Sequence, residues 1–395
     1  MILGTLLAIF ALAIAAPPLH RVLGRATGYV LALGPASGFV YYLTQMASTA
    51  SGEAVVRSWT WAEALGVDFA FRVDSLSTLF ALLVTGVGTA IVLYANSYLD
   101  GHPKRGRFFG YLMGFMGAML GLVIADDLIL LFIFWELTSI TSYLLIGFDH
   151  EREKARKSAL QALVVTGLGG LAMLAGLVLL GQIAGTFSVS GVIANAGALA
   201  DSQLTLAAMI LVLAGAFTKS AQFPFHFWLP NAMEAPSPVS AYLHSSTMVK
   251  AGVYLVARLN PAFAEDPAWQ WALAGFGGTT MLLGAYLATR QTYFKKVLAY
   301  TTVSSLGIMI MLIGLGAPPA AAAYILAHAL FKGALFLVAG IVDHEAGVKD
   351  TEQMGGLFKK MPITAIVAIV AGLSMAGVPP LLGFVGKELL LKGSL

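Results

Sequence analysis

Long apolar segments recur along almost the whole chain and are separated by short polar connections. Runs of roughly 17 to 25 apolar residues are long enough to cross the hydrocarbon core of a bilayer as α-helices, and the pattern contains about twelve of them. The sequence therefore predicts an all-α polytopic membrane protein. The approximate cores of the expected helices are residues 2–19, 27–46, 76–96, 108–125, 127–147, 158–182, 204–222, 240–258, 271–289, 296–315, 320–341 and 362–392.

Two of these segments, the seventh and the twelfth, are interrupted by proline. Pro224 follows residues 204–222, and the pair Pro379 and Pro380 divides residues 362–392. Proline removes a backbone donor and clashes with the preceding turn, so we expect broken helices at both places. Broken helices that carry ionisable residues are typical of secondary transporters.

The two interruptions lie five helices apart, and each has a lysine beside it, Lys219 and Lys387. This spacing predicts two copies of a five-helix unit, and an odd number of spans gives the copies opposite topologies. We therefore expect an N-terminal three-helix region at 1–107, a first repeat at 108–258 and a second repeat at 259–395, truncated within or just after the twelfth helix.

The distribution of Lys and Arg among the connections predicts the orientation. Connections after the expected helices 1, 3, 5, 9 and 11 hold 15 of the 23 Lys and Arg residues, whereas the opposite connections hold three. Positive connections face the cytoplasm, which places the N-terminus outside. The longest outer connection, residues 48–75, alternates like strands near its end, and we expect a hairpin there with Trp59 and Trp61 as interfacial anchors.

Composition supports the membrane class and excludes several others. Hydrophobic residues make up 58% of the chain and charged residues only 11%, against about 25% in soluble proteins. The absence of cysteine excludes disulfides, iron–sulfur clusters and thiolate zinc sites. No basic tail suggests nucleic acid. We treat GLGGLA at 167–172 as a chance match to a dinucleotide motif and expect no cofactor and no bond-making catalysis.

Ionisable residues inside the expected helices are the candidates for the functional site. A charge at membrane depth is costly and usually faces a bundle interior or a wet cavity. Glu136 lies near the middle of the fifth helix, with Lys219 as its natural partner. A structural ion pair is the simpler interpretation, but it does not explain the break beside Lys219. Asp126 and Asp127 lie at the helix boundary and are expected to be solvated or to cap the helix.

Two His–Lys combinations extend this set. His328 and Lys332 are four residues apart and therefore share one helix face. His244 and Lys250 are six residues apart, about 9 Å along a continuous helix but in different directions. A lone core histidine is usually structural, whereas two such combinations favour a proton relay. The candidate stations are Glu136, Lys219, His244, Lys250, His328, Lys332 and Lys387.

Four stretches of the sequence carry a family resemblance: FWELTSITSYLLIGF, FTKSAQFPFHFWLPNAMEAPSPVSAYLHSSTMVKAGVYLVAR, AHALFKGALFLVAGIVDH and GFVGKE. They resemble the antiporter-like subunits shared by respiratory complex I and the multisubunit Mrp-type sodium/proton antiporters. The combination is most similar to the large A subunit of the Mrp type, partly because Lys250 occurs in HSSTMVKAG.

The resemblance implies that Glu136 and Lys219 pair, that Lys250 or His244 continues the line, that His328 and Lys332 carry it onward, and that Lys387 ends it. Family members continue with further helices, so the resemblance also implies that the chain is a fragment or a partly represented subunit. The exit side of the Lys387 site is thereby left open.

The leading hypothesis is a subunit of a secondary active transporter in the plasma membrane. Protons would pass along the relay, coupled to sodium export by a complex with other subunits. No compact carboxylate cage appears in a span, so the sodium ligands stay unknown. One alternative is a proton-pumping subunit of a complex I-like NADH dehydrogenase or a membrane hydrogenase, and another is a passive scaffold with structural ion pairs.

Overall fold

A computed structural model describes residues 1–393 of the chain and consists mainly of α-helices. The last two residues of the predicted 259–395 region lie outside this description. Within it, eight segments are long and apolar enough to span a membrane, as expected for an all-α polytopic protein. They are Ile2–Ala50, Ser75–Tyr98, Arg105–Ile124, Leu128–Ile146, Glu153–Ala184, Pro267–Ala288, Phe294–Gly314 and Pro318–Ala346.

The count of about twelve spans is not confirmed, and the difference has two physical sources. The first segment contains two helices, α1 (Ile2–Leu23) and α2 (Thr27–Ala50), joined by a short 3₁₀ turn. Other expected spans are short or divided helices, including the apolar helices α10 (Thr205–Lys219) and α18 (Pro362–Ala376). A helix of 15 residues is about 22 Å long, less than the hydrocarbon thickness.

The contacts divide the chain into two compact units. The first comprises residues 1–148, 166–216 and 261–263, and the second comprises residues 149–165, 217–260 and 264–395. This division does not test the inverted five-helix repeats or their boundaries, which stay predictions.

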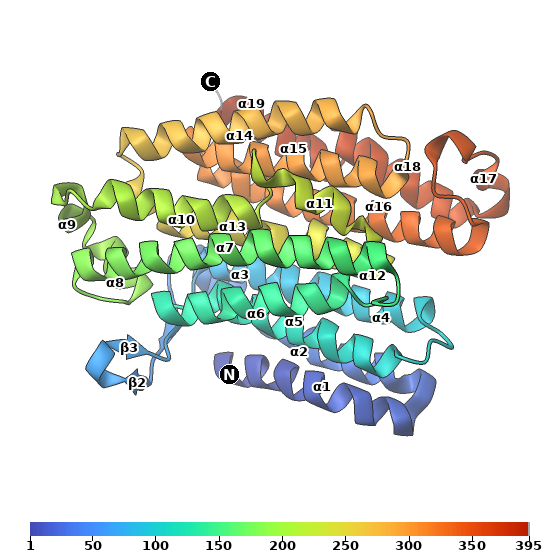
Figure 1. Ribbon diagram of the computed structural model, residues 1–395, viewed down its shortest axis with the longest axis horizontal. Coiled ribbons are helices and arrows are strands. Elements are labelled where there is room, and N and C mark those ends of the chain that lie inside the picture. The colour runs from blue at the N-terminus through green and yellow to red at the C-terminus, as the bar shows by residue number, and fades with distance from the viewer. Residues whose placement is uncertain (394–395) are drawn as a thin grey trace. The chain divides into compact units, whose positions relative to one another are not determined.

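In the first unit, α5 (Arg105–Ile124) lies beside α1 and α6 (Leu128–Ile146) (Figure 1). Glycines allow close packing: a Cβ at Gly121 of α5 would lie 2.5 Å from the Phe134 ring of α6. The other helical elements of the unit are a 3₁₀ turn (Glu63–Leu65), α3 (Ser75–Leu82), a π-helical turn (Leu83–Val87), α4 (Gly88–Tyr98), the part of α7 (Glu153–Ala184) from residue 166, α8 (Val189–Ala194), α9 (Ala196–Asp201) and most of α10.

The connection before α3 forms paired strands, as the sequence predicted. Strand β1 (Val55–Arg57) pairs antiparallel with β4 (Phe71–Val73), and β2 (Thr60–Ala62) pairs with β3 (Val67–Asp68). Trp59 and Trp61 are exposed at 46% and 56%, and their role as interfacial anchors stays a prediction. The side of the membrane that this hairpin faces stays a prediction.

Two neighbouring acids, Asp126 and Asp127, are buried and bound to backbone amides. The Oδ1 atom of Asp127 accepts hydrogen bonds of 2.9 Å from the amides of Ile129 and Leu130 and so caps α6. Asp126 accepts from the amide and the hydroxyl of Ser190. Capping is therefore the role that the structure supports for Asp127, and neither acid is solvated.

In the second unit, α14 (Pro267–Ala288), α15 (Phe294–Gly314) and α16 (Pro318–Ala346) run alongside one another (Figure 1). A Cβ at Gly277 of α14 would lie 2.6 Å from the Met311 amide nitrogen of α15, so glycine is required for this approach. The other helices are α11 (Trp228–Asn231), α12 (Ser237–Ser245), α13 (Ala251–Phe263, to Asn260 within the unit), α17 (Leu357–Lys360), α18 and α19 (Leu382–Gly393), with 3₁₀ turns at Phe225–Phe227, Ala232–Glu234, Met248–Lys250 and Thr351–Gln353.

Both predicted interruptions are present. Helix α10 ends at Lys219, and Ala221 then adopts a positive φ of 49° before Pro224. Helix α18 ends at Ala376 and is followed by Gly377, whose φ is 84°, and α19 begins only after Pro379 and Pro380.

The prediction of one continuous helix over residues 240–258 is wrong. Helix α12 ends at Ser245, a 3₁₀ turn covers Met248–Lys250, and α13 begins at Ala251. The hydroxyls of Ser245 and Thr247 bind the carbonyls of Ala241 and Tyr242, and such side chains compete with helical hydrogen bonds. The 9 Å estimate for His244 and Lys250 therefore does not apply, because the two residues lie on opposite sides of a break.

Candidate functional site

Glu136 lies in α6 and is half-buried against α7. A Cβ placed on Gly170 of α7 would collide with the Glu136 carboxylate oxygen. The glycine in GLGGLA thus leaves room for an acidic side chain, a role that the sequence reading did not assign to it.

Lys219 is completely buried at the last residue of α10. The C-terminal end of a helix carries partial negative charge, which stabilises a cation there. Lys219 belongs to the second unit and Glu136 to the first, and their pairing stays a prediction.

His244 occupies the last turn of α12 and is also completely buried. Its ring lies between the rings of Trp228 and Phe336, with centroid separations of 6.3 and 6.4 Å. Neither ring nitrogen has a hydrogen-bond partner among residues 1–393. A buried polar atom without a partner costs about 1–3 kcal/mol, so the His244 ring carries two unsatisfied polar atoms in the interior of the second unit.

Lys250, His328 and Lys332 are brought together around α16, and all three are completely buried. The Lys250 ammonium donates a 3.0 Å hydrogen bond to the carbonyl of Ile325 in α16. His328 Nδ1 lies 3.3 Å from the Ser245 carbonyl at the end of α12. Both sides of the break between α12 and α13 are therefore fixed to α16.

Lys332 lies one turn after His328 on the same face of α16. Its ammonium donates to the carbonyl of Leu298 over 3.1 Å and to the hydroxyl of Thr301, both in α15. His328 lies within electrostatic reach of Lys250 and Lys332, and its Nε2 has no partner in the part of the chain that the structure describes. This grouping agrees with the predicted shared face of His328 and Lys332.

Lys387 in α19 bridges the interruption between α18 and α19. Its ammonium donates to the carbonyl of Ala376 over 2.9 Å, and its stem lies against Gly377. The side chain is half-buried rather than enclosed. Its coupling to Lys332 stays a prediction.

Lys295 is a further buried lysine that the sequence analysis counted only as a positive charge of a cytoplasmic connection. It is 6% exposed at the start of α15, and its ammonium donates to the Ala235 carbonyl over 3.0 Å. It lies within electrostatic reach of His244. Lys295 lies three residues before Leu298 and seven before Thr302, both buried on α15, so the helical spacing puts it on the buried face of that helix. This spacing was the signal in the sequence that could have identified Lys295 as buried.

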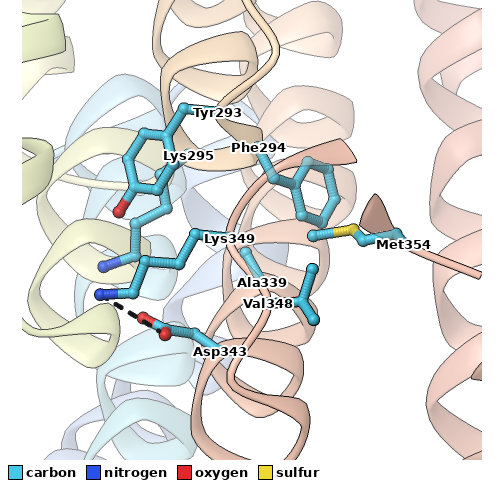
Figure 2. Close-up of a pocket in the computed structure, with 8 residues that line it drawn as sticks. All are labelled: Tyr293, Phe294, Lys295, Ala339, Asp343, Val348, Lys349 and Met354. Atoms are coloured by element: carbon cyan, nitrogen blue, oxygen red, sulfur yellow. Dashed lines mark ion pairs between the residues drawn. The ribbon is translucent and has the colours of Figure 1, made fainter. Parts of the chain in front are cut away.

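The surroundings of Lys295 are charged (Figure 2). The Lys349 ammonium lies 3.6 Å from an Asp343 carboxylate oxygen, and Tyr293 also lines this small hollow of roughly 10 Å³, about the room of one water molecule. Glu234 and Arg152, themselves paired at 2.5 Å, also interact electrostatically with Lys295. Lys295 therefore interacts electrostatically both with the buried His244 and with a group of partly exposed charges.

The described residues 1–393 contain no group of three or more His, Cys, Asp or Glu side chains placed to hold a metal ion. The cation ligands of the predicted transport are therefore left unassigned, as they were from the sequence.

Comparison with known proteins places these features in a family. Residues 125–395 match the model of the NADH:quinone oxidoreductase/Mrp antiporter transmembrane family, and residues 59–109 match that of the N-terminus of complex I chain 5. The A subunit of the Na⁺/H⁺ antiporter of Alkalihalophilus pseudofirmus is 48% identical over 96% of this chain and 50% of its own length. The A/B subunit of a probable K⁺/H⁺ antiporter of Rhizobium meliloti is 50% identical over 86% of this chain and 34% of its own length.

Solved structures give the same result. A chain of the Mrp complex from Dietzia sp. is 38% identical with a TM-score of 0.91, covering 99% of this chain and 43% of that one. A chain of respiratory complex I from Thermus thermophilus is 25% identical with a TM-score of 0.85, covering 99% and 82%.

These relatives confirm the resemblance to the Mrp A subunit that the sequence motifs indicated. The chain spans about half the length of the antiporter A subunits that it matches. Because the family model covers more than half of the chain, the chain belongs to the NADH:quinone oxidoreductase/Mrp antiporter transmembrane family.

Proposed function

We propose that this chain is part of a membrane subunit of a multisubunit cation/proton antiporter and conducts protons through its buried lysines and histidines. The observation that carries the proposal is the grouping of Lys250, His328 and Lys332 around α16, completely buried and hydrogen-bonded mainly to backbone carbonyls. A structural role alone rarely justifies several buried cationic groups, because each is costly inside a membrane.

The mechanism rests on electrostatic coupling between neighbouring stations. A proton gained by one basic group raises the free energy of a charge on the next, because Coulomb interactions are weakly screened in a protein interior. The groups therefore titrate as a coupled set rather than independently. Successive occupancy of Lys219, His244 or Lys250, His328 and Lys332 moves charge along the second unit towards Lys387. Glu136 belongs to the first unit, and its place in the relay stays a prediction.

The region around Lys295 supports a route for protons to this line. Lys295 contacts the Ala235 carbonyl, interacts electrostatically with His244 and neighbours the charges of Asp343 and Lys349. On the orientation inferred from the positive connections, this end faces the cytoplasm and the N-terminus lies outside the plasma membrane. Lysine and histidine here carry protons and make no covalent intermediate, so the activity is transport rather than enzymatic catalysis.

Sodium export is the coupled process we propose, since the related A subunits at 44–48% identity are named as parts of Na⁺/H⁺ antiporters. Partner subunits would complete the complex and supply the cation route. The alternative, a proton-pumping subunit of a complex I-like dehydrogenase, is supported by the fold shared with the Thermus thermophilus complex at 25% identity. Higher identity to antiporter subunits favours the first proposal.

The experiment is to purify the complex that contains the full-length subunit, identify its partners and reconstitute it in vesicles with an internal pH dye. The antiporter proposal predicts that adding Na⁺ without any electron donor drives proton movement. Potassium in place of sodium tests the ion. Partners that carry redox centres, together with proton movement that needs an electron donor, would contradict the antiporter proposal and support the alternative.

A further inference from the structure

One hydroxyl group joins the end of α10 to the break that precedes α13. Ser220 directly follows Lys219 and is completely buried. Its Oγ donates a 2.6 Å hydrogen bond to the carbonyl of Val249 and accepts a 3.1 Å hydrogen bond from the amide of Val253. The same side chain therefore binds both sides of Lys250.

One of these two hydrogen bonds caps the start of α13. The first amides of a helix lack partners within the helix, and a side-chain oxygen at the N-cap normally accepts from one of them. The N-cap residue of α13 is Lys250, which makes no capping hydrogen bond and whose side chain has no acceptor. Ser220 supplies the acceptor from a different segment.

The cap also fixes where the Lys250 side chain goes. The ammonium of Lys250 reaches the Ile325 carbonyl of α16 from within the turn that Ser220 holds between Val249 and Val253. Val249 and Val253 are four residues apart, which is the spacing of an ordinary α-helical hydrogen bond. Without the hydroxyl, their backbone groups can bond directly and continue the helix through Lys250.

We propose that Ser220 is a positioning residue for proton transfer, which holds the helix open at Lys250 and keeps the Lys250 ammonium on α16. It thereby couples the end of the helix that carries Lys219 to the station at Lys250. This inference rests on the proposed function, in which Lys219 and Lys250 are both stations of the relay.

The test compares Ser220→Ala with Ser220→Thr, which keeps a hydroxyl, in the full-length subunit within its complex. Ser304→Ala is the matched control, because Ser304 Oγ also donates to a backbone carbonyl of another helix, that of Met281, over 2.9 Å. Cryo-electron microscopy of each complex gives the Lys250 position. Vesicle assays give the maximal rate and the apparent KM for Na⁺ at matched amounts of assembled complex.

We expect Ser220→Ala to bring the Val253 amide within hydrogen-bond distance of the Val249 carbonyl and to move the Lys250 ammonium off the Ile325 carbonyl. The maximal rate should fall about tenfold or more with KM for Na⁺ unchanged, since misplacing a reacting group by about 1 Å can cost such factors. Ser220→Thr should restore both properties, and Ser304→Ala should match wild type.

A Ser220→Ala complex with Lys250 in its wild-type position, or with a wild-type rate, overturns the inference. If Ser220→Ala does not assemble, Ser220→Cys replaces it, because a thiol is a weaker donor and acceptor and should give an intermediate rate. Failure of the proposed function is recognised separately: the wild-type complex would then show no Na⁺-driven proton movement, while the Lys250 displacement in Ser220→Ala could still be observed.

Discussion

The ammonium of Lys250 donates a 3.0 Å hydrogen bond to the carbonyl of Ile325, one turn before His328 on α16. Helix α16 is thereby bound to Lys250, the residue at the break before α13. The next two turns of α16 carry His328 and then Lys332. Three buried basic groups of the second unit, Lys250, His328 and Lys332, thus converge on one helix.

Replacing Lys250 with methionine should abolish most proton movement and leave assembly nearly unchanged. Methionine keeps a flexible apolar side chain of comparable length but removes the titratable group. The Ile325 carbonyl lies within α16 and keeps its place in the helix. Vesicle assays with quantified complex check this result, and a wild-type rate would exclude Lys250 as a station.

Substitution of Gly170 with alanine should displace the Glu136 carboxylate and lower the exchange rate, with a stability loss of about 1–3 kcal/mol from overpacking. Gly167→Ala is the matched control, because a Cβ at Gly167 meets nothing within 4 Å in the same helix. Alanine is otherwise the better helix former, so Gly167→Ala should be neutral or stabilising. Equal behaviour of the two variants in thermal unfolding and exchange would contradict the packing of Glu136 on Gly170.

Asp127→Ala should destabilise the complex by about 0.5–2 kcal/mol, because α6 loses its N-terminal cap. Asp127→Asn keeps an oxygen that can accept from the same amides and should lose less. Thermal unfolding of the purified complex measures the difference. If alanine and asparagine gave the same midpoint, the capping role would be wrong.

Lys295→Ala should slow exchange, whereas the neighbouring Lys296→Ala should stay close to wild type. Lys295 is buried, bonded to the Ala235 carbonyl and within electrostatic reach of His244, while Lys296 is only half-buried. The adjacent lysines differ in burial but not in chemistry, so the comparison isolates position. A loss in both variants would indicate a general effect of positive charge at this end of α15.

What the sequence could predict depended on local signals. Pro224 and the pair Pro379 and Pro380 predict helix breaks, because proline cannot continue a helix. The four-residue spacing of His328 and Lys332 predicts that they share one helix face. These features are all present in the structure. The membrane class followed from the length of the apolar runs.

The features that the sequence did not predict depend on distant contacts. The break between α12 and α13 contains no proline or glycine, and its cap comes from Ser220 in another segment. Lys295 looks like an ordinary connection lysine until the Ala235 carbonyl is placed beside it. Gly170 resembled part of a chance motif because the group that requires a glycine there, the Glu136 carboxylate, lies on another helix.

The measurement that tests the relay most directly is Na⁺-driven proton movement by the full complex with Lys332→Ala, compared with wild type and with Lys360→Ala at matched assembly. Lys332 is completely buried and bound to α15, whereas Lys360 is exposed. The relay predicts that exchange is lost with Lys332→Ala and kept with Lys360→Ala. Normal exchange by an assembled Lys332→Ala complex would contradict the relay and leave Lys332 as a structural link between α15 and α16.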